Sequence, residues 1–176
     1  MALATAMHAV FADDVELSFG DRHVLVGFSL TVAPGERLGI VGPNGCGKST
    51  LLSIFAGLRP PDAGRVHHNG RVALLHQNPD FRGTTVEEVA RNALSWHGDL
   101  RRAYEAALAE GRMDEAADLQ ARLDDVGWVV EHRIDSLLTQ TGAPPKDRDL
   151  AGLSGGERRR LALAATLLAQ PDVLLL

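Results

Sequence analysis

The chain has 176 residues, which is enough for one domain with a substantial hydrophobic core. Its 18 basic and 23 acidic residues give a net charge of −5, which excludes a whole-chain basic field for nucleic acid but leaves local patches open. No apolar run approaches the roughly 20 residues of a membrane span. Residues 1–14 lack the basic start and long apolar middle of a signal peptide, and the single cysteine excludes a disulfide framework. These features favour a cytoplasmic protein with no segment inserted in a membrane.

Strands are predicted first along the chain. Residues 15–19 alternate apolar and polar side chains, and residues 24–32 continue as a second strand after a turn. A tight turn at 33–36 leads into the apolar run 37–41, which predicts a short buried strand. The apolar positions of residues 49–58 then predict a helix.

Between this strand and this helix lies a segment that fits the phosphate-loop pattern G-x-x-x-x-G-K-[ST]. It consists of Gly42, Pro43, Asn44, Gly45, Cys46, Gly47, Lys48, Ser49 and Thr50. A strand, a glycine loop and a helix in this order place backbone N–H groups and a helix N-terminus around a phosphate chain. The alternative is an ordinary glycine turn before a core helix, which the flanking elements disfavour.

Three side chains of this loop have predicted roles. Lys48 would reach the β- and γ-phosphates of a nucleotide, the Ser49 hydroxyl would hold Mg²⁺, and Thr50 could contact the α-phosphate. Only Lys48 and Lys146 are lysines among the 18 basic residues, and a compact ammonium suits such a pocket better than a guanidinium. We expect Cys46 to be a small residue packed in the loop, not a catalytic thiol.

Two more strands are predicted at 65–68 and 71–76. Asn69-Gly70 between them is a strong signal for a β-hairpin, so we expect these two strands to pair with each other. Gln77 closes the second strand.

The middle of the chain has helical periodicity. Thr85 and Glu88 predict a capping box that opens a helix running towards Trp96. Residues 98–126 carry two apolar faces separated by a break at Gly111, which predicts an antiparallel pair of helices.

The last third of the chain predicts two helices and a strand. The helices lie at 129–141, with Gly142 as the C-terminal cap, and at 157–169. Residues 171–176 predict a buried parallel strand. Because a chain terminus is unusual on a core strand, we expect the chain to be a fragment.

A second phosphate-binding motif is predicted at residues 153–157, Leu-Ser-Gly-Gly-Glu. Ser154, Gly155 and Gly156 open a helix and offer a hydroxyl, free N–H groups and the positive end of the helix dipole. The alternative is a plain N-cap role for Ser154.

The order of these motifs resembles that of the ATP-binding cassette (ABC) ATPases over nearly the whole chain. The resemblance implies that Phe19 stacks on adenine and that Gln77 reaches Mg²⁺ and the attacking water. It implies that the signature motif, Ser154, Gly155, Gly156 and Glu157, grips the γ-phosphate of ATP bound to a partner cassette. Phe19 could instead be a core strand residue, and Gln77 a polar strand end.

The resemblance also concerns catalysis. Residues 172–176 resemble the Walker B strand, after which family members have an Asp, a catalytic Glu and a switch histidine that are absent here. Lys48 and Gln77 would be the catalytic residues that the chain retains. The complete parent would be an ATP hydrolase, and we expect the fragment alone to bind nucleotide weakly and to be inactive.

The segment between Gln77 and Ser154 resembles the ABC-F branch, whose members have two cassettes in one chain and a helical arm, and act on the ribosome or confer antibiotic resistance. Ribosomal RNA would be bound by arginines of the pair: Arg101, Arg102, Arg112 and Arg122. A solvated helix face is the alternative for each of them. The alternative for the whole pair is the coupling subdomain of a transporter ATPase, with a membrane partner and homodimeric cassettes.

We therefore predict an α/β fold, with a P-loop NTPase core of the ABC ATPase type, an antiparallel β-subdomain and an inserted helical subdomain, together forming an incomplete domain. The expected parts are 10–82 (β-subdomain and phosphate-loop core), 84–142 (helical subdomain with an arm-like pair at 98–126) and 150–176 (signature helix and Walker B strand).

Overall fold

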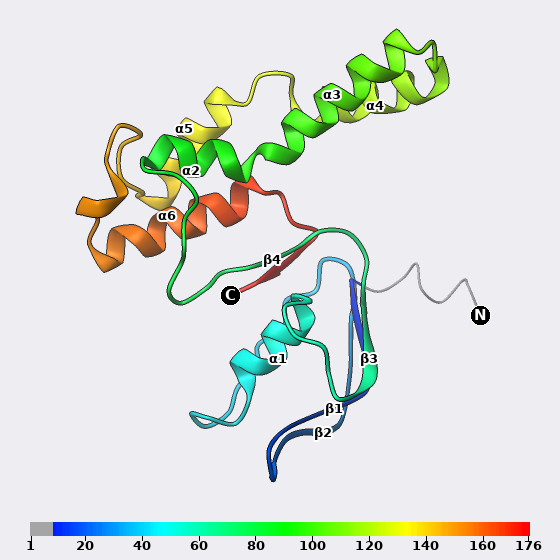
Figure 1. Ribbon diagram of the computed structural model, residues 1–176, viewed down its shortest axis with the longest axis vertical. Coiled ribbons are helices and arrows are strands. Elements are labelled where there is room, and N and C mark those ends of the chain that lie inside the picture. Colours follow the sequence, from blue (N-terminus) through cyan, green and yellow to red (C-terminus); the bar gives the residue numbers. More distant parts are fainter. Residues whose placement is uncertain (1–8) are drawn as a thin grey trace. The chain divides into compact units, whose positions relative to one another are not determined.

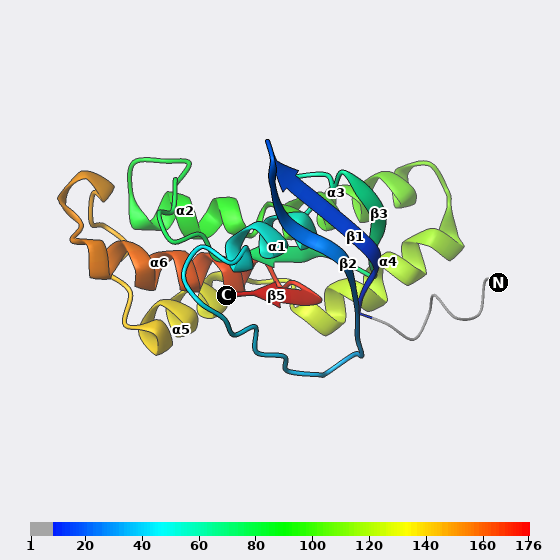
Figure 2. The same ribbon diagram turned by 90° about the horizontal axis from the view of Figure 1, so that it is seen from below.

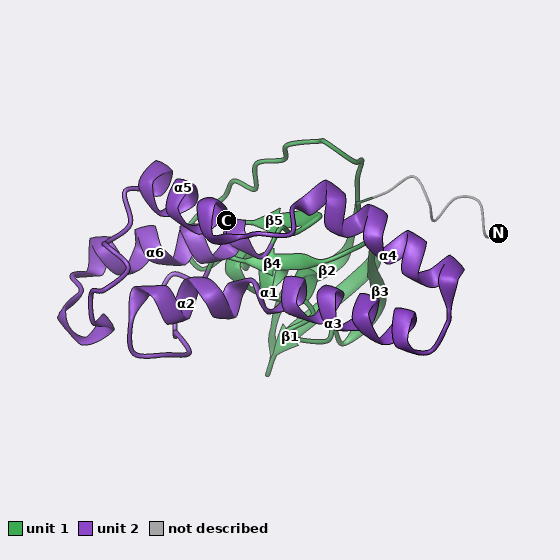
Figure 3. Ribbon diagram, turned by 90° about the horizontal axis from the view of Figure 1, so that it is seen from above, with its two compact units in different colours: residues 1–75, 170–176 green, residues 76–169 purple. Residues whose placement is uncertain are grey.

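Figure 1 shows the computed structural model of the chain, which describes residues 9–176. The chain divides into two compact units, coloured separately in Figure 3. The described residues up to Leu75 form unit 1 together with Gln170–Leu176, and His76–Ala169 forms unit 2. The first eight residues of the stretch 1–14, which was assessed for a signal peptide, lie outside the described part.

Unit 1 contains a three-stranded antiparallel sheet in the order β2-β1-β3 (Figure 2). Its strands are β1 (Val10–Phe19), β2 (Arg22–Val32) and β3 (Ala63–His68). The strands predicted at 15–19 and 24–32 are confirmed, and β1 begins earlier than predicted. The tight connection between β1 and β2 places Phe19 opposite Arg22.

The alternation of buried residues in β1 shifts by one position at Asp14. Val10 and Ala12 are buried before it, and Val15 and Leu17 are buried after it. Asp14 has a positive φ of 49°, and the pairing with β2 is irregular at this point. An extra residue of this kind is a β-bulge, which here keeps both apolar pairs on the same face of the sheet.

Helix α1 (Lys48–Phe55) completes the core of unit 1. Leu51, Ile54 and Phe55 are buried in one cluster with residues of β1. The helix predicted at 49–58 is confirmed but ends earlier, before Gly57, which has a φ of 69°.

The parallel strand predicted at the end of the chain is confirmed. β4 (Val72–Leu74) and β5 (Val173–Leu175) form a two-stranded parallel sheet, and Leu175 is buried in the same cluster as β1 and α1.

The hairpin predicted around Asn69-Gly70 is wrong, because β3 pairs with β1 whereas β4 pairs with β5. The dipeptide does form a sharp bend, in which Gly70 has a φ of 86°. The Arg71 N–H donates to the Asp172 carboxylate at 2.7 Å, so a residue far along the chain holds this bend. The turn signal is local and does not determine which strands the bend connects.

The strand predicted at 37–41 is also wrong. These residues belong to neither sheet of the described part, and the side chains of Leu38 and Val41 are 50% and 93% exposed. A parallel strand is stable when it is paired along an edge and covered on both faces. Residues 9–176 provide neither condition for this segment.

Unit 2 is helical. Its elements are α2 (Val86–Ala93), α3 (Ser95–Ala109), α4 (Met113–Val126), α5 (Glu131–Thr141), the 3₁₀ helix η2 (Leu150–Gly152) and α6 (Gly155–Leu168). α2, α5, η2 and α6 share one core that includes Val86, Ile134, Leu161 and Leu168. The helices predicted at 129–141 and 157–169 are thereby confirmed, and Gly142 ends α5 with a φ of 63°.

The antiparallel pair predicted at 98–126 is confirmed as α3 and α4, which lie side by side in Figures 1 and 2. The pair has a core of its own, formed by Leu100, Ala107, Ala116, Leu119 and Leu123. Leu108 and Met113, which the periodicity placed on the apolar faces, are exposed because they lie near the turn that joins the helices.

The helix predicted to run towards Trp96 is interrupted at Leu94, where α2 ends and α3 begins. Its predicted cap is partly confirmed. The Thr85 hydroxyl accepts a hydrogen bond from the Glu88 N–H at 3.3 Å, as expected for an N-cap. The Glu88 carboxylate accepts from the N–H and hydroxyl of Thr84, not from Thr85, and these bonds lower the pKa of Glu88.

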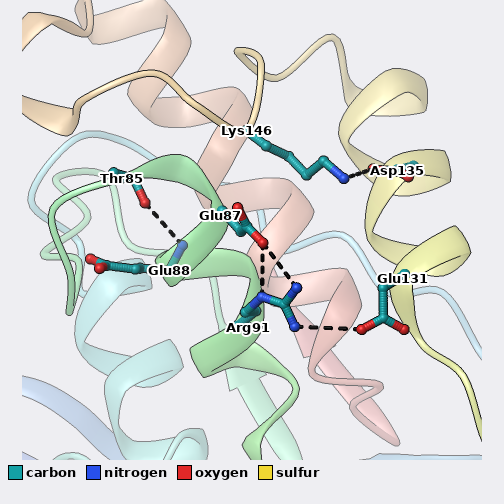
Figure 4. Close-up of polar contacts among 7 residues, drawn as sticks. All are labelled: Thr85, Glu87, Glu88, Arg91, Glu131, Asp135 and Lys146. Atoms are coloured by element: carbon teal, nitrogen blue, oxygen red, sulfur yellow. Dashed lines mark hydrogen bonds and ion pairs between the residues drawn. The ribbon is translucent and has the colours of Figure 1, made fainter.

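Three ion pairs involve α2, α5 and the segment that follows α5, and one of them, Arg91–Glu131, joins α2 to α5 (Figure 4). Arg91 contacts Glu87 at 2.9 Å and Glu131 at 3.5 Å, and Lys146 contacts Asp135 at 2.6 Å. Each of these side chains is about half exposed, so solvent screens the charges and each pair contributes little to stability. Among the described helices, none combines the length and the apolar composition that crossing a lipid bilayer requires.

Candidate nucleotide-binding site

The glycine-rich segment of unit 1 bends sharply into α1. Gly45 and Gly47 have φ values of 79° and 102°, a region that side chains strongly disfavour. A Cβ on Gly47 would overlap the Cγ1 atom of Val24, so the loop also requires glycine for space. A Cβ on Gly42 would lie 2.8 Å from the Cys46 Sγ atom. The loop shape therefore requires glycine at Gly45 and Gly47, whereas at Gly42 an added Cβ would require the Cys46 side chain to move.

The ammonium group of Lys48 lies over the loop. Its Nζ donates to the carbonyl oxygens of Gly42 at 2.8 Å and Pro43 at 2.9 Å, and lies 3.9 Å from the Cys46 Sγ. Cys46 is exposed, which corrects the prediction that it is packed in the loop. The positive charge of Lys48 is therefore held at the loop by two carbonyl groups of the loop backbone.

The N-terminus of α1 is open to an anion. Its N-cap is Gly47, which has no side chain to occupy the first N–H groups, and the first turn contains no acidic residue. The first N–H groups of any helix lack partners within the helix. Together with the Lys48 ammonium, these donors fit a polyphosphate chain. The hydroxyl-bearing residues Ser49 and Thr50 lie in this first turn, where an oxygen ligand for Mg²⁺ would be needed.

The first residue of β2, Arg22, contacts this loop, and its strand partner is Phe19, the last residue of β1. The Arg22 guanidinium donates to the Gly45 carbonyl at 2.8 Å. Phe19, paired with Arg22 across the sheet, is 46% exposed, so the alternative that it is a core strand residue is wrong. The Arg59 guanidinium lies 4.2 Å from the centre of the Phe19 ring, a cation–π contact. Sequence reasoning missed Arg22 and Arg59, since neither belongs to a local motif.

The signature residues lie at the N-terminus of α6 in unit 2. Ser154 is the N-cap, as the alternative prediction had it, and it forms a complete capping box with Glu157. The Glu157 carboxylate accepts from the Ser154 N–H at 2.8 Å and from its hydroxyl at 2.7 Å. These bonds, with weaker help from Arg148 and Arg160, lower the pKa of Glu157. Gly155 and Gly156 form the exposed first turn.

Gln77 follows β4, and its side chain is exposed. It lies just after the point where the chain passes from unit 1 to unit 2. In unit 1, Arg22 contacts residues 42–50 through Gly45, and Phe19 is the strand partner of Arg22. Unit 2 contains Gln77 and the signature residues 154–157.

The glycine loop, the lysine over it and the open helix N-terminus are typical of the P-loop class of proteins. The comparison with known families narrows this class. Residues 25–176 match the ABC transporter family, and the chain belongs to that family. The resemblance that the sequence motifs suggested is therefore confirmed.

Several curated relatives share this cassette. The tylosin resistance ATP-binding protein TlrC of Streptomyces fradiae is 44% identical over 90% of this chain and 32% of its own length. The energy-dependent translational throttle protein EttA of Mycobacterium tuberculosis is 35% identical over 92% of this chain and 31% of its own length. The mycobactin import ATP-binding/permease protein IrtB of Mycolicibacterium thermoresistibile is 38% identical over 93% of this chain and 27% of its own length. The chain thus spans about a third or less of these relatives.

Solved structures support the fold. An ATP-binding subunit of an ABC transporter has a TM-score of 0.70 at 20% identity, covering 94% of this chain and 64% of that one. CbiO1 from Clostridium perfringens, part of the ABC transporter complex CbiONQ, has a TM-score of 0.60 at 23% identity, covering 96% and 64%. The predicted α/β fold of the ABC ATPase type, with its antiparallel sheet and helical part, is therefore confirmed.

Proposed function

We propose that this chain is the ATP-binding cassette of a cytoplasmic protein that binds and hydrolyses ATP with Mg²⁺. The observation that carries the proposal is the Lys48 ammonium, held by two loop carbonyls beside the open N-terminus of α1. Similarity to relatives named as ATP-binding proteins supports the same ligand. Phe19, which is exposed and pairs with Arg22, would stack on the adenine ring.

Each residue would have a separate part in phosphate transfer to water. Lys48 and the first N–H groups of α1 would hold the terminal phosphates in line for attack. Ser49 would supply a ligand to Mg²⁺, which neutralises phosphate charge when bound. Gln77 would orient the attacking water.

The signature residues would act on a second cassette, in the same chain or in a homodimer. Ser154, Gly155 and Gly156 would contact the γ-phosphate of ATP bound to that cassette. Their position at a helix N-terminus supports an anion ligand.

Within the family, we propose that the parent protein belongs to the ABC-F branch and acts on the ribosome. Support comes from relatives whose names refer to tylosin resistance and to a translational throttle. The α3–α4 pair, with its own hydrophobic core, suits the arm of that branch. Three of its four candidate RNA-binding arginines, Arg101, Arg102 and Arg112, form ion pairs with neighbouring carboxylates, which favours a solvated face for them.

The second candidate is the ATP-binding subunit of a membrane transporter. The similarity to IrtB, a protein named for mycobactin import, favours it. In that case α3 and α4 would contact a membrane-embedded partner.

The first experiment compares Lys48→Ala with Lys146→Ala, which removes the other lysine of the chain. Binding of a fluorescent ATP analogue with Mg²⁺ should weaken by about 10- to 100-fold in Lys48→Ala, because a charged donor is lost. Lys146→Ala should bind as the unaltered protein does. Equal affinity in both variants would contradict ATP binding at this loop.

A second experiment separates the two branches. The full-length protein, held in its ATP-bound state, is centrifuged through a sucrose cushion with ribosomes and, in parallel, with membranes. Sedimentation with ribosomes alone supports the ABC-F proposal, and sedimentation with membranes alone supports the transporter.

A further inference from the structure

Three consecutive arginines in the first turns of α6 have different surroundings. Successive residues of a helix point about 100° apart. The Nε atom of Arg160 donates to the Gly142 carbonyl at 2.7 Å, at the end of α5. Arg159 is exposed, and its side chain makes no hydrogen bond or ion pair within residues 9–176.

Arg158 differs from both, because its half-buried guanidinium contacts two separate segments. Its Nη1 donates to the Leu150 carbonyl at 3.3 Å, just before the signature motif. Its Nη2 donates to the Pro79 carbonyl at 3.4 Å. The same group lies 5.2 Å from the centre of the Phe81 ring. A planar guanidinium can make all three contacts at once, which a lysine ammonium cannot.

The segment that Arg158 contacts has little other support. Residues 76–81 follow β4 and belong to no helix or strand. Within the described chain, the bond from Arg158 to Pro79 is the one hydrogen bond that their backbone makes. Gln77 lies two residues before Pro79, so its position depends on this anchor.

We propose that Arg158 is a positioning residue that fixes the Gln77 segment to the signature helix. The inference rests on the proposed function, in which Gln77 orients the attacking water. Without Arg158 the segment would lose its anchor, and Gln77 would occupy the reactive position for less of the time. ATP affinity would be retained, because the phosphates bind to residues 42–50.

The test compares Arg158→Ala with Arg159→Ala in the full-length protein. The N–H groups of residues 76–81 make no hydrogen bond within the described chain, so the order of the segment is probed by limited proteolysis. Chymotrypsin cleavage after Phe81 in the native protein should become about fivefold faster in Arg158→Ala, the ratio expected for losing one hydrogen bond. The ATPase kcat should fall by a similar factor, whereas the KM for ATP should stay within about twofold. Arg159→Ala should match the unaltered protein in both measurements.

Several results would overturn the proposal. Unchanged cleavage after Phe81 in Arg158→Ala would show that the contact does not hold the segment, and faster cleavage with unchanged kcat would show that the contact does not serve the reaction. Equal losses in both variants, or a rise in KM alone, would also contradict it. If Arg158→Ala does not fold, Arg158→Lys, which keeps the charge but not the fork, should give an intermediate rate of cleavage after Phe81 and an intermediate kcat, and values equal to those of the unaltered protein would overturn the proposal.

A failure of the proposed function looks different. In that case the unaltered full-length protein would have no Mg²⁺-dependent ATPase activity, or the Lys48→Ala substitution would not reduce that activity. The cleavage measurement would then still decide whether Arg158 holds residues 76–81, and an unchanged rate of cleavage after Phe81 would overturn that contact on its own.

Discussion

The N-termini of α1 and α6 carry related motifs but present opposite chemistry. α1 begins after Gly47 with no side-chain cap and no acidic residue in its first turn. α6 begins after Ser154 with a complete capping box, and Glu157 occupies the serine N–H and hydroxyl. The first helix is therefore ready for an anion, whereas the second already holds a carboxylate where a phosphate would bind. A phosphate at α6 would have to displace Glu157 from Ser154.

The largest effect should come from Gly47→Ala, which changes the N-cap of α1. An alanine in this left-handed backbone conformation would destabilise the fold by about 1–2 kcal/mol. Its Cβ atom would also overlap Val24. We expect a lower Tm and loss of Mg²⁺-ATP binding, measured by thermal unfolding and calorimetric titration.

Gly57→Ala is the matched control, since Gly57 also has a positive φ of 69° but has nothing within 4 Å of an added Cβ. It should lower the Tm and leave ATP binding intact. If both variants bind ATP equally well, the fit of the loop against Val24 does not determine the site.

A smaller effect is expected for Arg22→Ala, which removes the hydrogen bond to Gly45. The loop would keep Lys48 and the open helix, so ATP affinity should fall only about three- to tenfold, as for one exposed charged hydrogen bond. Arg37→Ala removes the same charge from an exposed position nearby in sequence and should have no effect. A loss of equal size in both variants would point to general electrostatic attraction.

Much of this site could be predicted from local sequence. The phosphate loop, α1, the α3–α4 pair and the start of α6 all follow from spacing, glycines and capping residues that lie close together in the chain. The sequence could not reveal Arg22 or Arg158, because their partners, Gly45 and Pro79, are 23 and 79 residues away.

The failed predictions have a similar cause. The apolar run 37–41 has the composition of a buried strand, but composition does not supply a partner strand. Asn69-Gly70 bends as predicted, yet β3 and β4 take partners elsewhere, and Asp172 holds the bend. Phe19 was open to two interpretations because strand alternation alone does not show which residues at a strand end are covered.

Removing the cap of α6 should affect stability without affecting the open site. Ser154→Ala should lower the free energy of unfolding by about 1 kcal/mol, the usual value for an N-cap, and leave Mg²⁺-ATP affinity at residues 42–50 unchanged. Ser136→Ala removes an exposed serine hydrogen bond from the middle of α5 and is the control, with little expected change. A loss of ATP affinity in Ser154→Ala would contradict the independence of the two helix ends.

The smallest effect concerns the pH dependence that Glu157 contributes. Hydrogen bonds from Ser154 lower its pKa from the ordinary value of 4.5, so the folded state binds a proton less readily than the unfolded state. The resulting stabilisation is present above that ordinary value and is lost as the pH falls through the lower folded value. Denaturant unfolding between pH 7 and pH 3 should therefore show a shallower loss of stability in Glu157→Gln. Glu105→Gln, which removes an exposed carboxylate from α3, controls for the change in net charge. If the two variants have the same pH profile, the Glu157 carboxylate is not held by Ser154 in solution, and α6 would be as open to an anion as α1.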